Sequence, residues 1–74
     1  MFYSKEEIEM AYRNGKKEVR AKYNKSIKLS FSTQGWSLFY DGVHSVVEFE
    51  YFVHGGGVVQ SQTHRVCLPD QPKP

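Results

Sequence analysis

Apolar and polar side chains alternate along most of residues 27–53, and the pairs Gln34-Gly35 and Asp41-Gly42 interrupt the alternation. A period of two places successive side chains on opposite faces of a strand, so each half-buried strand has one apolar face. A glycine-containing pair between two such strands is typical of a tight hairpin turn. The pattern therefore predicts an antiparallel meander of four strands, near residues 26–33, 36–40, 43–54 and 58–68.

An amphipathic helix is predicted before this segment, at about residues 4–23. Ser4 is a favourable N-cap, and Glu7 three positions later completes a capping box. One apolar stripe follows the helical repeat, namely Ile8, Ala11, Tyr12, Gly15, Val19 and Tyr23. Gly15 costs about 1 kcal/mol of helix stability relative to Ala. Its place in the apolar stripe indicates that the helix approaches another surface closely there.

The helix and the strands supply complementary apolar faces, and this complementarity fixes the expected fold class. One face of the predicted sheet collects Ile27, Leu29, Phe31, Trp36, Leu38, Tyr40, Val43, Val47, Phe49, Tyr51 and Val53. Packing of the helix on this face gives an α+β domain over residues 1–68, with a flexible, proline-rich tail at 69–74. A curled, barrel-like sheet is the alternative, because the long third strand must bend between its two neighbours.

The opposite face of the sheet, which the helix leaves uncovered, is the predicted binding surface. A three-residue loop at Gly55–Gly57 gathers five residues there: Phe39, His44, Val46, Val66 and Leu68. A loop of two or four residues inverts the last strand, because a shift of one residue moves every side chain to the other face. It then places Val59, Arg65 and Cys67 on that face instead. The sequence leaves both orientations of the last strand open.

No group of residues in the sequence predicts catalysis, a cofactor or a metal ion. His64 and Cys67 resemble a nucleophile pair, but residues three apart on a strand point to opposite faces. The histidines at positions 44, 54 and 64 lack the close spacing of zinc ligands. We therefore expect a protein that is not an enzyme.

Charge divides the chain into a basic first third and a mildly acidic remainder. Residues 1–28 hold eight Lys or Arg and four Glu, whereas residues 29–74 hold two Lys or Arg and four Asp or Glu. The basic residues of the predicted helix surface are Arg13, Lys16, Lys17 and Arg20. They predict contact with an acidic protein surface or with phosphates, although a solvated helix face is the simpler interpretation. Direct nucleic-acid binding is expected to be weak or absent, because Glu48 and Glu50 occupy the open face of the sheet.

These features favour a small, non-enzymatic protein-binding module. Its size and composition resemble accessory proteins of phages and mobile elements, which implies an inhibitor or modulator of a larger protein or nucleoprotein machine, for example one that counters host defence. The alternatives are a nucleic-acid-binding module that uses the basic helix and a homodimerising structural domain. The single Cys67 favours a reducing compartment, and neither a membrane span nor a signal peptide is predicted. The expected location is the cytoplasm of the host cell.

Overall fold

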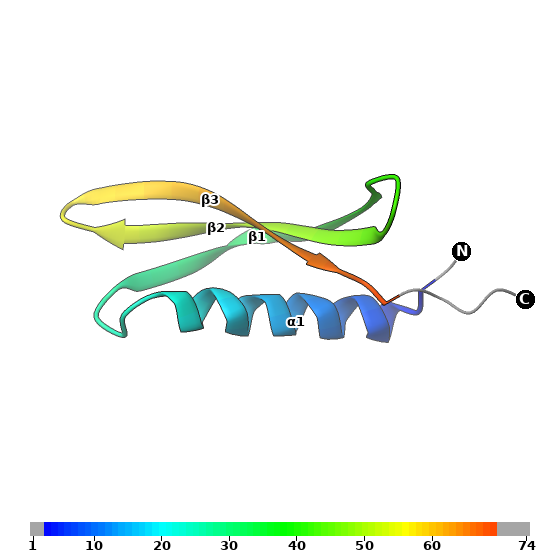
Figure 1. Cartoon of the computed structure of the whole chain (residues 1–74). Helices are drawn as coiled ribbons and strands as arrows, with labels where there is room; N and C mark the ends of the chain where they lie inside the picture. The colour runs from blue at the N-terminus through cyan, green and yellow to red at the C-terminus, as the bar shows by residue number, and fades with distance from the viewer. Residues whose placement is uncertain (1–2, 70–74) are drawn as a thin grey trace, which may run out of the picture.

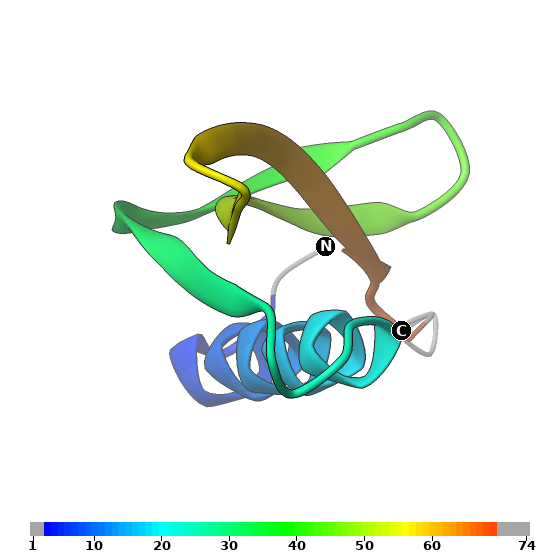
Figure 2. The same cartoon turned by 90° about the vertical axis from the view of Figure 1, so that its left-hand side faces the viewer.

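A computed structural model describes residues 3–69, in which α1 (Lys5–Lys22) lies along one face of an antiparallel sheet (Figure 1). The sheet has the strand order β1-β2-β3, and its strands are β1 (Lys28–Tyr40), β2 (Ser45–Gly55) and β3 (Val58–Cys67). The α+β class and the N-terminal helix are confirmed. The sheet is open, with α1 on one side of it only (Figure 2), so the barrel-like alternative is wrong. Residues 70–74 of the predicted tail lie outside the described residues.

The prediction of two short strands at residues 26–33 and 36–40 is wrong, because both belong to β1. The pair Gln34-Gly35 does not reverse the chain, and both halves of β1 pair with β2. The register shifts between Phe31 and Trp36, where four residues of β1 lie opposite Glu50 of β2, an insertion larger than the usual one-residue β-bulge. The insertion keeps Phe31 and Trp36 on the helix-facing side, where each packs against the buried core. β1 therefore pairs with β2 on both sides of this irregularity, and the hairpin predicted between residues 26–33 and 36–40 is not formed.

The loop between β1 and β2 is longer than the two residues expected at Asp41-Gly42. Tyr40 pairs with Ser45, so four residues form the loop. The carboxylate of Asp41 accepts hydrogen bonds from the backbone N–H groups of His44, at 2.7 Å, and Val43, at 2.8 Å. These two donors hold the pKa of Asp41 below its ordinary value. The two extra residues shift the register by an even number, so the faces of β1 and β2 remain as predicted.

Two residues form the turn between β2 and β3, and this length decides the orientation of the last strand. Gly55 pairs with Val58, which leaves Gly56 and Gly57 as the central residues. Both have positive φ angles, of 59° and 75°, as a type I′ hairpin turn requires. The three-residue loop is therefore wrong, and the alternative orientation of β3 is the one observed. Residues of β3 with even numbers face the helix, as the pairing of Val66 with Val47 shows.

The helix begins as the sequence predicts, with a complete capping box. The hydroxyl of Ser4 accepts a hydrogen bond from the backbone N–H of Glu7 at 3.1 Å, and the N–H of Ser4 donates to the Glu7 carboxylate at 3.2 Å. Tyr3 before the cap packs against the cluster that contains Ile8, and its hydroxyl donates to the carbonyl of Pro69. The start of α1 is thereby joined to the end of β3.

None of the helices described within residues 3–69 is long and apolar enough to span a membrane.

The core consists of two neighbouring clusters between α1 and the sheet. The first contains the buried residues Ile8, Ala11, Val47 and Leu68, and the second contains Val19, Phe49 and Tyr51. Gly15 lies between them, and a methyl group added there would lie 2.7 Å from both Phe49 Cε1 and Val66 Cγ2. The predicted close approach of helix and sheet is therefore confirmed at this residue.

A pair of tyrosines closes the end of the core near the C-terminus of α1. The hydroxyl oxygens of Tyr23 and Tyr51 lie 3.2 Å apart, and their rings meet edge to face. The hydrogen bond with Tyr23, followed by burial, raises the pKa of Tyr51 to about 12. The neutral phenol is thus the form that the folded protein stabilises.

Candidate functional site

Phe39 lies on the uncovered face of the sheet, but its ring is partly covered there. It pairs with Val46, and both residues point away from α1. The guanidinium of Arg65 stacks over the Phe39 ring at 5.1 Å and donates a hydrogen bond of 2.7 Å to the Glu48 carboxylate. Phe39 is consequently half-buried, and Val46 beside it is only 2% exposed. This part of the open face is a small packed cluster within the domain.

The other members of the predicted patch lie elsewhere. Val66 and Leu68 face α1 because the turn before β3 has two residues instead of three. Leu68 is 3% exposed and belongs to the first core cluster, and Val66 packs against both clusters. His44 lies in the loop after β1. The assignment of Val66 and Leu68 to the uncovered face is therefore wrong, and the five residues do not form one patch.

Two of the four predicted basic residues lie on the flank of α1 that borders β1. The Lys16 ammonium stands 4.3 Å from the centre of the Tyr12 ring and 5.9 Å from that of Phe31. Arg20 stacks over the same Phe31 ring at 5.0 Å. The aliphatic stems of both residues can cover the aromatic edge of the core while their charges stay in water. These two cations are therefore held in place by the fold.

The other two basic residues, Arg13 and Lys17, are exposed on α1. They add positive charge to the helix surface, but no described aromatic contact fixes their position. The structure thus separates the predicted basic group into two positioned and two freely solvated side chains.

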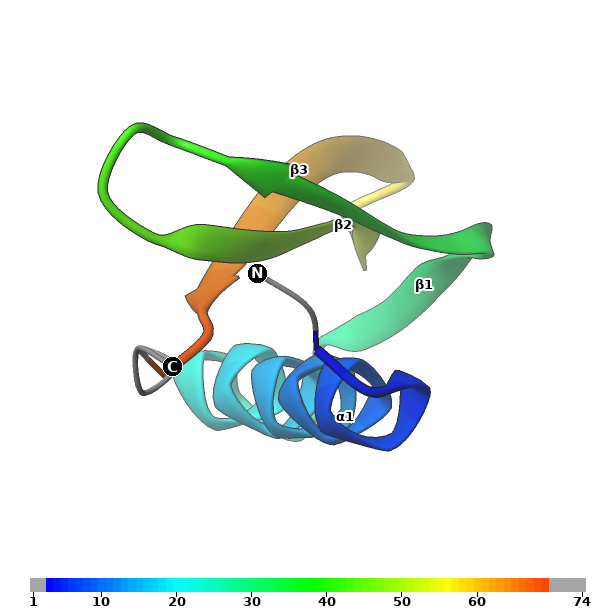
Figure 3. The same cartoon turned by 90° about the vertical axis from the view of Figure 1, so that its right-hand side faces the viewer.

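Three apolar side chains at the β1–β2 hairpin are exposed, contrary to the sequence prediction. Leu38, Tyr40 and Val43 are 42%, 58% and 68% exposed, although the sequence pattern assigns them to the core face. Leu38 and Tyr40 do lie on that face of β1, but the sheet twists and carries the hairpin away from the straight helix (Figure 3). The apolar face therefore continues beyond the area that α1 covers.

Leu38 and Tyr40 lie on the same face of β1 as Phe31 and Trp36, and Lys16 and Arg20 contact the Phe31 ring farther back along that strand. We refer to them together as the β1-side surface: Tyr12, Lys16, Arg20, Phe31, Trp36, Leu38, Tyr40 and Val43. It runs from two cations at the second half of α1 to an exposed apolar group at the hairpin. Aromatic residues and Arg are enriched at protein-binding surfaces, and the β1-side surface contains both.

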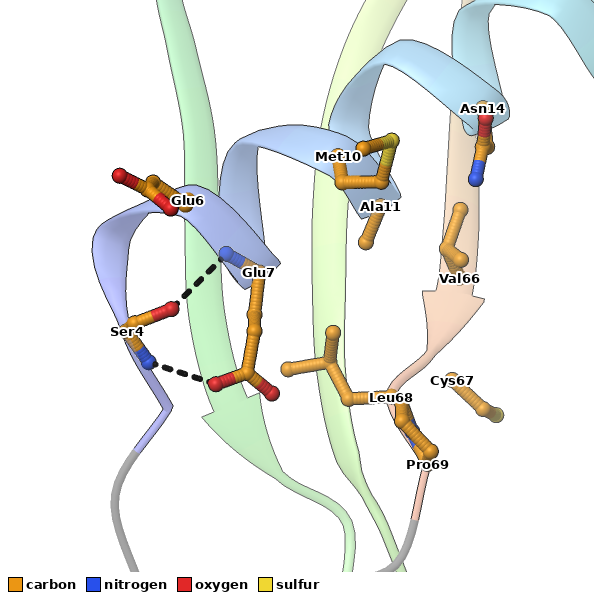
Figure 4. A pocket seen from close by; sticks show the side chains of 10 residues that line it. All are labelled: Ser4, Glu6, Glu7, Met10, Ala11, Asn14, Val66, Cys67, Leu68 and Pro69. Atoms are coloured by element: carbon orange, nitrogen blue, oxygen red, sulfur yellow. Dashed lines mark hydrogen bonds between the residues drawn. The ribbon is translucent and has the colours of Figure 1, made fainter.

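The opposite flank of α1 borders β3 and contains a groove of about 460 Å³ (Figure 4). Met10 and Ala11 of the helix form one wall, and Val66, Leu68 and Pro69 form the other. Glu6 and Glu7 stand at the end of the groove near the start of the helix. The two flanks of α1 thus differ in charge.

His64 and Cys67 are not brought together, as the strand geometry predicts. His64 faces the helix, where its ring packs on Phe49 at 5.5 Å and its Nε2 atom lies 3.9 Å from a carboxylate oxygen of Glu18. Cys67 pairs with Val46 and is exposed. The two side chains therefore cannot act as a nucleophile and its base in this fold. No three His, Cys, Asp or Glu side chains gather as a metal-binding group within residues 3–69.

Comparison with protein-family models, with curated proteins and with solved structures finds no match to this chain.

Proposed function

We propose that the chain is a small, non-enzymatic protein-binding module that inhibits or modulates a larger protein or nucleoprotein complex. The observation that carries the proposal is the exposure of Leu38, Tyr40 and Val43 at one end of the β1-side surface. Single exposed apolar residues are common on protein surfaces, but a contiguous group is typical of a contact site. A partner that covers these side chains would remove their apolar surface from water, which would stabilise the complex.

The partner that this surface fits has an apolar patch for the hairpin and acidic side chains farther along, opposite Lys16 and Arg20. Tyr40 and Leu38 supply the apolar contact, and tyrosine is among the residues that most often dominate interface energies. Lys16 and Arg20 lie along the same surface and are already ordered by stacking on aromatic rings. Charges of this kind mainly accelerate association and select the partner. The proposal includes action in the cytoplasm of the host cell, where a single free thiol is stable.

Nucleic-acid binding through the same cations is the second candidate. Lys16 and Arg20 lie over the half-buried rings of Tyr12 and Phe31, and such cations can also receive phosphates. Titration with labelled DNA and RNA at two salt concentrations separates the two functions. Contacts with phosphates give an affinity that falls steeply with salt, whereas binding through the apolar hairpin does not.

Capture of the partner from the cells that produce the protein tests the proposal. Tagged wild-type protein is compared with Tyr40→Ala, and Val58→Ala serves as the matched control. Tyr40 and Val58 are both 58% exposed and pair with opposite ends of β2, so neither change should unfold the domain. We expect wild type and Val58→Ala to retain the same partner and Tyr40→Ala to lose it. Equal recovery by all three proteins, with unchanged urea unfolding, would show that the hairpin is not the contact.

A further inference from the structure

The outer edge of β3 is a free sheet edge without the usual protection. In the described part of the chain β3 pairs only with β2, in an unbroken register from Val58 to Cys67. Its ten residues include no Pro, no Lys and no bulge, and Arg65 is its only residue with a full charge. The β1 edge, in contrast, has a bulge and begins with Lys28. Natural sheets use such features to prevent strand addition, so the two edges differ in their capacity to accept another strand.

The groove between α1 and the end of β3 lies beside this free edge. Its volume of about 460 Å³ falls within the range of sites that hold small ligands or side chains. Met10 is 54% exposed at its wall, and the opposite wall is formed by the end of β3 (Figure 4). A strand added to β3 would direct every second side chain to the helix side, toward the groove.

The charges around the groove specify what the added strand should carry. Glu6 and Glu7 line the groove, and the Glu18 carboxylate lies farther along the same flank, beside β3 residue His64. None of the described residues that line the groove is Lys or Arg. Basic side chains on the incoming strand therefore meet carboxylates of α1.

A second copy of the chain is a poor occupant of this edge. Two copies joined by antiparallel pairing of β3 with β3 would place their acidic helix flanks, with Glu7 and Glu18, on the same side of a shared sheet. Like charges in such proximity oppose association. The charge pattern instead favours a different, basic segment.

We propose that the free edge of β3 and the adjoining groove bind an extended basic peptide segment of a partner protein. The segment adds as a strand to β3. Every second side chain of the segment faces α1, and these side chains alternate between large apolar residues, which enter the groove, and Lys or Arg, which meet the acidic flank. Backbone hydrogen bonds provide the affinity in this mode of recognition, and the alternate side chains provide the specificity. This site lies on the flank of α1 opposite the β1-side surface and is independent of it.

The test uses the whole protein and a blocked octapeptide with the repeat Thr-Leu-Thr-Lys. A peptide with the repeat Thr-Leu-Thr-Glu has the same length and apolar content and serves as the control probe. Backbone amide shifts of the whole protein are followed by NMR. We expect the Lys peptide to shift the amides of β3 and the Glu peptide to leave them unchanged.

Matched variants distinguish this site from general attraction between opposite charges. Met10→Arg adds a charge at the groove, whereas Thr33→Arg adds the same charge at an exposed position of β1, away from the groove. We expect Met10→Arg to weaken binding of the Lys peptide about tenfold or more and Thr33→Arg to weaken it less than about threefold. The double change Glu6→Gln with Glu7→Gln should also weaken binding, and it preserves the capping box because glutamine serves at that position.

Three results would overturn the proposal. Equal binding of both peptides would remove the charge argument, and the absence of β3 shifts with the Lys peptide would remove the site. A change in the same β3 amides with protein concentration alone, accompanied by a dimer in sedimentation, would show that a second copy occupies the edge.

Discussion

Replacement of Gly15 by alanine tests the closest contact between α1 and the sheet. The added Cβ would lie 2.7 Å from Phe49 Cε1, 2.7 Å from Val66 Cγ2 and 3.2 Å from Phe49 Cζ. Ordinary carbon contacts begin near 3.5 Å, so the helix or the ring must move by about 1 Å. Phe49 has little freedom to move, because it is 3% exposed and is packed against neighbouring aromatic rings.

Two opposing effects set the size of the change. Overpacking of a filled core costs about 1 to 3 kcal/mol, whereas alanine improves helix propensity over glycine by about 1 kcal/mol. Since atoms of Phe49 and of Val66 both block the methyl group, we place the overpacking cost in the upper part of that range. The expected net loss for Gly15→Ala is about 1 to 2 kcal/mol of unfolding free energy.

Urea unfolding followed by circular dichroism measures this loss. Ala21→Gly, at an exposed position of the same helix, measures the propensity effect alone and should cost about 1 kcal/mol. The variant Val66→Ala removes one of the two blocking groups, so Gly15→Ala should be less harmful in that background. A midpoint for Gly15→Ala above that of wild type by the propensity gain would refute the reasoning, because the methyl group would then meet open space.

Three further predictions concern the tyrosine pair, the cation over Phe39 and the β2–β3 turn. Because the pKa of Tyr51 is about 12 in the folded protein and about 10 in the unfolded chain, the unfolding free energy should fall between pH 10 and pH 12. Urea midpoints across that window should fall less for Tyr51→Phe, and an equal fall would contradict the assignment. A double-mutant cycle of Phe39→Leu and Arg65→Gln should give a coupling of about 0.5 to 1 kcal/mol, and additive losses would show that the stacking contributes nothing. Gly57→Val should destabilise the protein because β-branched residues disfavour a φ of 75°, whereas Gly56→Asn should be tolerated; equal unfolding midpoints for the two variants would count against the type I′ turn.

The helix could be predicted because its signals are local. Ser4 and Glu7 contact each other within one turn, so their spacing in the sequence is sufficient to define the cap. The faces of β1 and β2 could also be predicted despite errors in loop length. A register change of two residues leaves every side chain on its original face, as the four-residue loop after Tyr40 demonstrates.

The number of strands and the orientation of β3 depend on features that the sequence does not distinguish. Gly35 has a positive φ of 80°, which suits a bulge as well as a turn, so the pair Gln34-Gly35 is ambiguous. Three successive glycines permit turns of two or three residues with equal ease, and only one length sends Val66 to the core. The exposed group at Tyr40 arises from the twist of the whole sheet relative to a straight helix. The position of the hairpin relative to α1 depends on how the helix and the whole sheet pack together, so no local sequence pattern predicts it.

α1 and the end of β3, the first and the last described parts of the chain, bury each other's apolar side chains. The apolar stripe of α1 is made early in translation, yet Ile8 packs in the same cluster as Leu68, sixty residues later. The helix therefore has no complete partner until nearly all of β3 has been synthesised, because Val66 and Leu68 supply part of its covering surface. A ribosome that stops before Val66 would release a chain with an uncovered helix stripe, a target for proteolysis and aggregation. Only chains translated through β3 would then bury the apolar stripe of α1 and persist.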